Sequence, residues 1–375
     1  MINIQDLITP CYIFDLERFE QNVNELCDCF RKYYSKFKFG YSYKTSYFEP
    51  FLRSAKRLGA LAEVVSGKEY ELALSIGVDN SQIIYNGVIP NPEYKTMVAH
   101  AGGFVHVENM VELRQLVEDY GVKELGVRVC FPIDGVFDSR FGFYVDGPEF
   151  CEMQNFVKEK GVRINVVHCH VSHARSAQGF LARIKVLIDV AKRLGATAVN
   201  IGGNMYGRIT NDAFRAQFPN YCTVKDYGQV VGGEMKKAFP QEDVLLLAEG
   251  GTPVVSDVVS IVFEVMAVKR INGKDFIIVD GQVSDAGFAC KYKSPPYRHF
   301  GKKDNIVEHA AVVGCTCIED DYIVKDYSGP ANVGDKIVVD NVGAYSYNLV
   351  NDFITTGCRR FYSINEVDFT LAASL

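Results

Sequence analysis

The chain has 375 residues, of which 48% are hydrophobic and 23% charged, and its formal net charge is −6. This composition is that of a globular protein with enough length for one large core or two moderate ones, so we expect two unequal domains. The sequence has no block of Lys and Arg able to neutralise a row of phosphates, which argues against a nucleic-acid partner.

The N-terminal residues lack the basic start and apolar run of a signal peptide, and no apolar stretch approaches the roughly 20 residues needed to span a bilayer. We therefore expect a cytoplasmic protein with no membrane partner. The eleven cysteines are scattered and fit neither a disulfide scaffold nor paired zinc ligands, so no metal site is expected.

From about residue 38 to 250, short β-rich apolar runs alternate with segments of helical periodicity. The expected helices include residues 92–101, 108–120 and 179–194. The expected strands number eight, at residues 38–45, 61–66, 83–87, 104–107, 125–130, 164–171, 198–203 and 244–250. This pattern predicts an α/β fold, a (β/α)8 TIM barrel over residues 15–255. An open doubly wound sheet is the competing layout, but its G-x-G-x-x-G fingerprint is absent after the first strand.

After residue 255 the pattern changes to strand-like runs such as VVSIVFEVMAVKRI and DKIVVDNVGAY, separated by Asn-Gly, Asp-Gly and Val-Gly-Asp turns. Residues 256–375 are therefore expected to form an all-β, sandwich- or barrel-like C-terminal domain.

Polar residues lie where the expected barrel strands end, which is where barrel enzymes carry their active sites. Lys44 ends the first strand and Glu249 the eighth, while His170 and the Gly202-Gly203 turn end the sixth and seventh. A buried lysine amine is costly unless it is paired, neutralised or used covalently, and a Schiff base would explain it. The alternative is a lysine at the rim that reaches solvent.

The other strand ends are open to two interpretations each. The glycine turn could bring backbone N–H groups close to a phosphate or be a simple tight turn. Glu249 could cap a helix or pair with a cation such as a protonated pyridine nitrogen. His168 and His170 share one face of their strand, where one could stack on a cofactor ring or both could bind a metal.

In this order, these segments resemble the fold-type III pyridoxal-phosphate decarboxylases, the family of diaminopimelate, ornithine and arginine decarboxylases. The opening TPCYIFDLERFEQNVNEL resembles the family's threaded first strand, which would tie residues 1–14 to the β domain. YSYKTS resembles its lysine motif, with Lys44 forming the Schiff base to pyridoxal 5'-phosphate. The resemblance over nearly the whole chain implies these cofactor-binding residues: Lys44, Glu63, Ser66, His170 (stacking), Gly202, Gly203, Asn204, Glu249 (pyridine nitrogen), Gly250, Gly251, Thr252 and Tyr345.

In the β domain, VVGCTCIEDD places Cys317 on the family's catalytic cysteine and Asp321 on its later acid. The resemblance also implies a homodimer in which the Cys317 loop completes the neighbour's site in trans.

The departures from the family pattern concern the phosphate and the substrate. Asn204 replaces a third glycine, Ser172-His173 replaces Gly-Ser, and Thr252 replaces an arginine. Ile318 stands where diamine-forming enzymes carry an acid, and an apolar side chain cannot pair with a buried ammonium.

These residues predict a decarboxylase acting at Cα of an amino acid other than the standard diamino acids. Alternatives are a diaminopimelate- or ornithine-type enzyme in which Glu319 or Asp320 supplies the acid, an amino-acid racemase, a non-catalytic pyridoxal-phosphate-binding protein, and a metal-dependent hydrolase using the two histidines. The substrate-contact candidates are Ile318, Asp321, and, for an anionic or polar tail, His173, Arg140, Arg298 and His299.

Overall fold

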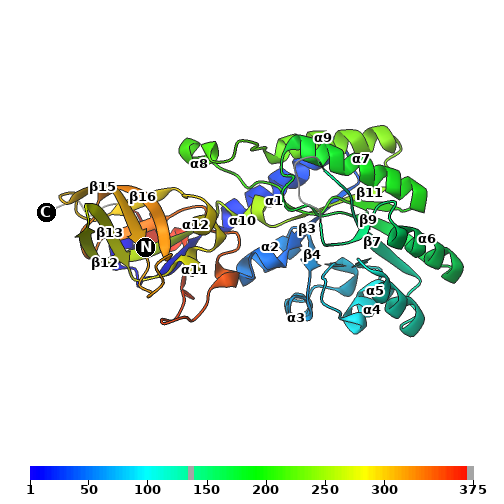
Figure 1. Ribbon diagram of the computed structural model, residues 1–375, viewed down its shortest axis with the longest axis horizontal. Coiled ribbons are helices and arrows are strands. Elements are labelled where there is room, and N and C mark those ends of the chain that lie inside the picture. Colours follow the sequence, from blue (N-terminus) through cyan, green and yellow to red (C-terminus); the bar gives the residue numbers. More distant parts are fainter. Residues whose placement is uncertain (134–138, 370–375) are drawn as a thin grey trace.

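The computed structural model of the chain describes residues 1–133 and 139–369. Figure 1 shows a strand barrel wrapped by helices at one end and a unit built mainly of strands at the other. Among the described residues, every helix is too short or too polar to cross a lipid bilayer.

Eight parallel strands form a closed barrel. Each pairs with its neighbours around the ring, and the ring closes through pairing of β6 with β7 and of β11 with β3. The strands are β3 (Phe37–Ser42), β4 (Leu61–Val64), β5 (Ile83–Tyr85), β6 (Phe104–Val107), β7 (Glu124–Cys130), β9 (Arg163–His168), β10 (Ala198–Asn200) and β11 (Leu245–Gly250). The two-residue strand β8 (Phe143–Tyr144) pairs in parallel with the end of β7. The predicted fold class is confirmed, including the count of eight barrel strands.

The helices before, between and after the barrel strands bury apolar side chains. They are α1 (Leu16–Arg31), α2 (Glu49–Arg57), α3 (Gly67–Ser75), α4 (Pro92–His100), α5 (Met110–Arg114), α6 (Pro148–Lys160), α7 (Ala177–Leu194), α8 (Asp212–Ala216), α9 (Val224–Ala238) and α10 (Thr252–Val255). α7 has defined ends because the Ser176 side chain accepts the Gly179 N–H and Gly195 adopts φ 64°. The helix expected over 108–120 is divided, since α5 gives way to a π-turn at Gln115–Asp119.

The first barrel strand ends at Ser42, so the prediction that Lys44 closes it was wrong. Lys44 instead lies in a 3-10 turn, Tyr43–Thr45, directly beyond the strand. The side-chain amide of Asn348 satisfies two backbone carbonyls of this turn. Its Nδ2 donates to the carbonyls of Tyr43 and Lys44 at 3.3 and 3.0 Å.

The second unit is a mixed sheet in the order β14-β17-β12-β13-β15-β16. β2 pairs with both β12 and β18, so the residues just before the first barrel helix belong to this sheet. Its strands are β2 (Cys11–Phe14), β12 (Val259–Ile271), β13 (Lys274–Val279), β14 (Tyr297–Phe300), β15 (Ile306–Val313), β16 (Tyr322–Pro330), β17 (Lys336–Val339) and β18 (Phe361–Ser363), with the short helices α11 (Val283–Ala286) and α12 (Phe288–Tyr292) and a separate pair formed by β1 (Ile2–Asn3) and β19 (Val367–Asp368).

Candidate active site

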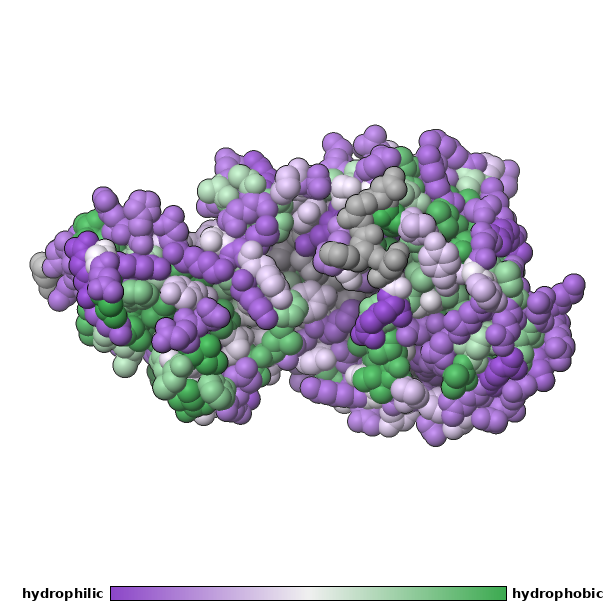
Figure 2. All heavy atoms as spheres, in the orientation of Figure 1, coloured by the Kyte–Doolittle hydropathy of each residue, from purple (hydrophilic) through white to green (hydrophobic). Residues whose placement is uncertain are grey.

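A cavity of about 480 Å³ lies at the carboxyl ends of the barrel strands, where α12 and the segment after β17 of the β domain also meet it. Figure 2 shows a hollow between the two halves of the molecule. The residues that line the cavity come from both units and include Lys44, Thr45, His170, His173, Arg175, Gly203, Asn204, Glu249, Gly251, Thr252, Ser256, Phe288, Lys293 and Tyr345.

The amine of Lys44 enters this cavity and is paired with a buried carboxylate. Its Nζ atom lies 2.7 Å from Oε1 and 2.5 Å from Oε2 of Glu63, whose side chain is inaccessible to solvent. Burial alone would lower the pKa of the Lys44 amine, but the carboxylates of Glu63 and Glu249 outweigh it and raise that pKa. Burial raises the pKa of Glu63, against the opposing effect of Lys44.

Glu249 is a second buried carboxylate, at the end of β11. Its Oε1 accepts two amide hydrogen bonds at 2.7 Å, from Asn86 Nδ2 and Asn200 Nδ2, and its Oε2 lies 3.4 Å from His168 Nε2. Burial lowers the pKa of His168 well below its usual value, so this ring is neutral. The two asparagines therefore fix the position of the Glu249 side chain, and no Lys or Arg of residues 1–133 and 139–369 forms an ion pair with it.

His170 is held against the glycine turn. Its Nδ1 accepts the Gly203 N–H at 3.2 Å, and burial lowers its pKa well below the usual value, so the ring is neutral with its proton on Nε2. Gly202 has φ 63°, and a Cβ there would lie 2.5 Å from the Cys169 carbonyl oxygen. This close passage of strand end and turn requires glycine.

Arg183 holds the Gly202-Gly203 turn in place. It belongs to α7, and its side chain is wholly buried. One guanidinium nitrogen donates to the carbonyls of Ile201 and Gly203 at 2.9 and 3.0 Å, and another donates to those of Val171 and Ala174 at 3.3 Å each. Through these carbonyls Arg183 links the loop after β9 to the loop after β10 at this edge of the cavity.

Two buried hydroxyl oxygens beside the cavity find no hydrogen-bond partner among the described residues, Thr45 Oγ1 and Ser256 Oγ. Each faces a glycine with no room for a side chain. A Cβ on Gly251 would lie 1.9 Å from Thr45 Oγ1, and one on Gly207 would lie 1.8 Å from Ser256 Oγ. Such a cradle of small residues and unpaired donors fits a phosphate group.

Tyr345 reaches the same cavity from the β domain. Its N–H donates to the Thr45 carbonyl at 3.0 Å and its carbonyl accepts the Phe288 N–H at 3.2 Å, at a backbone φ of 57°. Asn204 also has positive φ, 73°, directly after the glycine turn.

Several predicted residues lie elsewhere. Ser66 caps α3 and Gly250 ends β11, and neither lines the cavity. Arg140 is exposed beside Phe141, while Arg298 and His299 pair with Asp340 and Asp335 at 2.7 and 2.8 Å.

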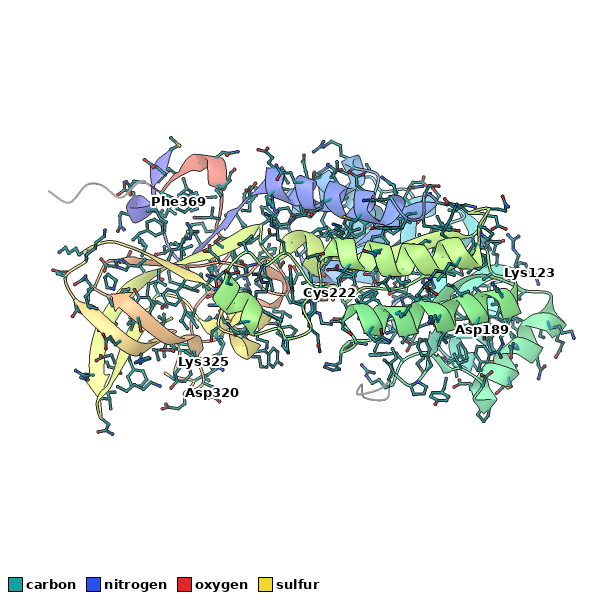
Figure 3. All side chains as sticks on the ribbon, turned by 90° about the horizontal axis from the view of Figure 1, so that it is seen from above. Lys123, Asp189, Cys222, Asp320, Lys325 and Phe369 are labelled. Atoms are coloured by element: carbon teal, nitrogen blue, oxygen red, sulfur yellow. The ribbon has the colours of Figure 1, made fainter. Side chains whose placement is uncertain are left out.

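Cys317 and Ile318 are exposed and line a separate hollow of about 410 Å³ in the β domain. Asp321 is buried beneath this loop, where it accepts hydrogen bonds from the Val283 N–H at 2.6 Å and the Thr316 hydroxyl at 2.5 Å. Figure 3 shows neighbouring Asp320 in the half of the molecule opposite Lys123. Within one chain, Cys317 and Lys44 line different hollows.

Three contributors were not singled out from the sequence as site residues: Asn200, Arg175 and Arg183. Asn200 stands two residues before the glycine turn, so its place at a strand end was a usable signal. Arg183 looks like any charged residue on an amphipathic helix, and its burial follows from the packing of α7 on the turn.

A closed barrel whose mouth holds a paired lysine amine, a fixed carboxylate and a phosphate-sized cradle defines a cofactor-dependent barrel enzyme. The chain belongs to the pyridoxal-dependent decarboxylase family, because the pyridoxal-binding domain of that family matches residues 20–256. It is a decarboxylase of amino acids, and its cofactor is pyridoxal phosphate.

Similar proteins agree with this assignment. A diaminopimelate decarboxylase of Methanocaldococcus jannaschii is 24% identical over 93% of this chain and 84% of its own length. The arginine decarboxylase of Paramecium bursaria Chlorella virus superposes with a TM-score of 0.82 at 17% identity, covering 96% of both chains. The lysine/ornithine decarboxylase of Vibrio vulnificus gives 0.79 at 21% identity, again covering 96% of each chain.

Proposed function

We propose that this decarboxylase removes the α-carboxylate of an amino acid whose distal group is not an ammonium, with Lys44 as the covalent attachment point of the cofactor. The observation that carries the proposal is the charge of the cavity wall. Among the described lining residues the one carboxylate is Glu249, which Asn86 and Asn200 hold, whereas Lys293 adds positive charge. A distal ammonium buried there would lack a partner.

The residues fit the cofactor. Lys44 Nζ would carry it, Glu63 would accept the proton that the amine must lose, and Glu249 would keep the ring nitrogen protonated. The neutral His170 ring would stack on the cofactor, and the turn at Gly203, with the hydroxyls of Thr45 and Ser256, would bind its phosphate. Bound pyridoxal phosphate supplies an electron sink for the charge left at Cα when CO2 departs.

We further propose that the enzyme works as a homodimer, with the Cys317 loop of one subunit entering the neighbour's cavity to return a proton to Cα. The exposure of Cys317 and its separation from Lys44 within one chain support this arrangement. Asp321 would keep the loop in shape through its contacts with Val283 and Thr316. Exposed apolar side chains on the β domain supply surface for an interface, among them Met266, Ile271, Ile306, Val333, Phe353 and Ile354.

The nearest rival is a substrate with a distal ammonium, as the names of the relatives suggest. Glu319 and Asp320 are exposed beside Ile318 and would be the acids able to hold such a group. Family membership favours decarboxylation over the racemase, storage and metal-hydrolase alternatives.

The test is CO2 release from a panel of D- and L-amino acids with acidic, neutral, diamino and conjugated side chains, after borohydride reduction has located the cofactor. We expect reduction to label Lys44, and turnover to be highest with an acidic or neutral side chain. Best turnover with ornithine, lysine or meso-diaminopimelate would contradict the substrate proposal, and a label on another lysine would contradict the role of Lys44.

A further inference from the structure

Arg175 lines the cavity and forms no ion pair with an acid in the part of the chain that the structure describes. It lies in the loop between β9 and α7, just before the helix cap Ser176. Its Nε donates to the Asn204 carbonyl at 3.3 Å and one terminal nitrogen donates to the Met205 carbonyl at 3.0 Å. The guanidinium carbon stacks 4.0 Å from the centre of the Tyr206 ring.

Burial lowers the pKa of Arg175, which measures the cost of keeping this cation in the wall. Two other arginines of the barrel have acids, since Arg18 lies 3.5 Å from Asp257 and Arg128 lies 3.4 Å from Glu108. The terminal nitrogens of buried Arg183 instead donate to four backbone carbonyls. Among the described residues, no Asp or Glu oxygen lies within ion-pair distance of Arg175. The Asn204 and Met205 carbonyls accept hydrogen bonds from the guanidinium, and the Tyr206 ring stacks on it. None of these groups carries a negative charge, so the positive charge of Arg175 remains available to an anion in the cavity.

The surroundings of the Arg175 guanidinium indicate which anion it would bind. Arg175 holds the carbonyls of the two residues that directly follow the Gly202-Gly203 turn, and Tyr345 lines the same cavity. Thr252 also lines the cavity, and it stands at the position where the family resemblance places an arginine, so it adds no charge. Two guanidinium groups lie near the turn. Arg183 donates to four backbone carbonyls behind it and does not line the cavity, so a phosphate cradled by the turn would face Arg175.

We propose that Arg175 binds the phosphate of the cofactor and supplies the charge that Thr252 does not. This inference rests on the proposed cofactor pose in the Lys44 cavity. A guanidinium presents planar N–H donors that match phosphate oxygens, and a charge-assisted bond is about twice as strong as a neutral one. The other source of an anion in this cavity is a carboxylate on the substrate, and the experiment distinguishes the two.

The experiment titrates cofactor-free wild type, Arg175→Met and Arg175→Lys with pyridoxal phosphate and, separately, with pyridoxal, which lacks the phosphate. For Arg175→Met we expect affinity for pyridoxal phosphate to fall by roughly 10- to 100-fold, with less than about a threefold change for pyridoxal and partial rescue by lysine. The 31P resonance of bound cofactor should titrate at higher pH in Arg175→Met than in wild type, because the dianion has lost its cation.

Tyr206→Leu is the matched control, since it removes the stacking ring but keeps the guanidinium. It should leave the preference for pyridoxal phosphate over pyridoxal within about threefold of wild type. The inference is overturned if Arg175→Met weakens both ligands equally, as a structural role would require, or weakens neither while raising KM for an acidic substrate. A failure of the proposed function would be recognised by a different result. In that case borohydride would not label Lys44 of the wild-type protein.

Discussion

Lys44 and Glu63 form a close ion pair inside the barrel mouth, with Nζ 2.7 Å from one carboxylate oxygen and 2.5 Å from the other. The pair raises the pKa of the amine although burial acts in the opposite direction. Before the cofactor attaches, Lys44 is therefore an ammonium, and it must release a proton to become a nucleophile. Glu63, whose pKa is raised by burial, is the adjacent acceptor.

We expect Glu63→Gln to shift the onset of cofactor attachment to lower pH by at least about 1 unit, because the substitution removes the charge that keeps the amine protonated while burial still favours the neutral form. The measurement is the absorbance change on mixing cofactor-free protein with pyridoxal phosphate across pH 6–10. An unchanged pH profile would mean that Glu63 does not control the proton on Lys44.

Glu249→Gln should lower kcat by at least about 100-fold while leaving the borohydride label on Lys44, because a neutral amide cannot keep the ring nitrogen protonated. Asn86→Ala, which removes one of the two donors to Glu249, should have a smaller effect of about tenfold. CO2 release with the best substrate of the panel measures both. Equal activity of Glu249→Gln and wild type would exclude this role.

Arg183→Met should lower the free energy of unfolding by at least about 3 kcal/mol, because it leaves four buried backbone carbonyls without their donor. Arg193→Met is the control on the same helix. Its partner Asp146 is exposed, so the loss should be below about 1 kcal/mol. Denaturant unfolding of both variants tests the difference, and similar losses would refute a special role for Arg183.

Gly251→Ala should weaken cofactor binding and lower stability, because the new methyl group would lie 1.9 Å from Thr45 Oγ1 and 2.2 Å from Thr45 Cβ. Gly233→Ala, inside α9, adds the same methyl group where nothing lies within 4 Å, and it should stabilise the protein by about 0.5–1 kcal/mol. Thermal unfolding with and without pyridoxal phosphate compares them. A Gly251→Ala protein as stable and as well loaded as wild type would be inconsistent with this packing.

The stability should also depend on pH through His106, a buried histidine whose ring centre lies 4.8 Å from that of His168. Burial lowers the pKa of His106 well below its usual value, so the unfolded chain binds a proton that the folded chain does not. Its contribution is complete above about pH 6.5 and is lost as the pH falls toward the folded-state pKa, by about 1.4 kcal/mol per pH unit. His106→Leu should reduce the slope of unfolding free energy against pH by that amount below pH 6.5 and leave it unchanged above pH 7.

The order and type of the barrel strands could be predicted because a parallel strand in a closed barrel is an apolar run of a few residues, with little competing interpretation. The run at 244–250, for example, is found as Leu245–Gly250, and that at 104–107 as Phe104–Val107. The end of the first strand was placed too late because Tyr43 and Thr45 look like strand residues. The contact that ends the strand comes from Asn348, some 300 residues further along the chain.

The sequence by itself determined the barrel, the β domain and the polar residues at the strand ends, since local periodicity and turn chemistry carry that information. Only the tertiary structure decided which of those residues act together. It paired Lys44 with Glu63, joined Asn86 and Asn200 on Glu249, and placed Arg175 in the cavity wall with backbone carbonyls as its hydrogen-bond partners. These relationships depend on distances between segments brought together by barrel closure, and no spacing along the chain encodes them.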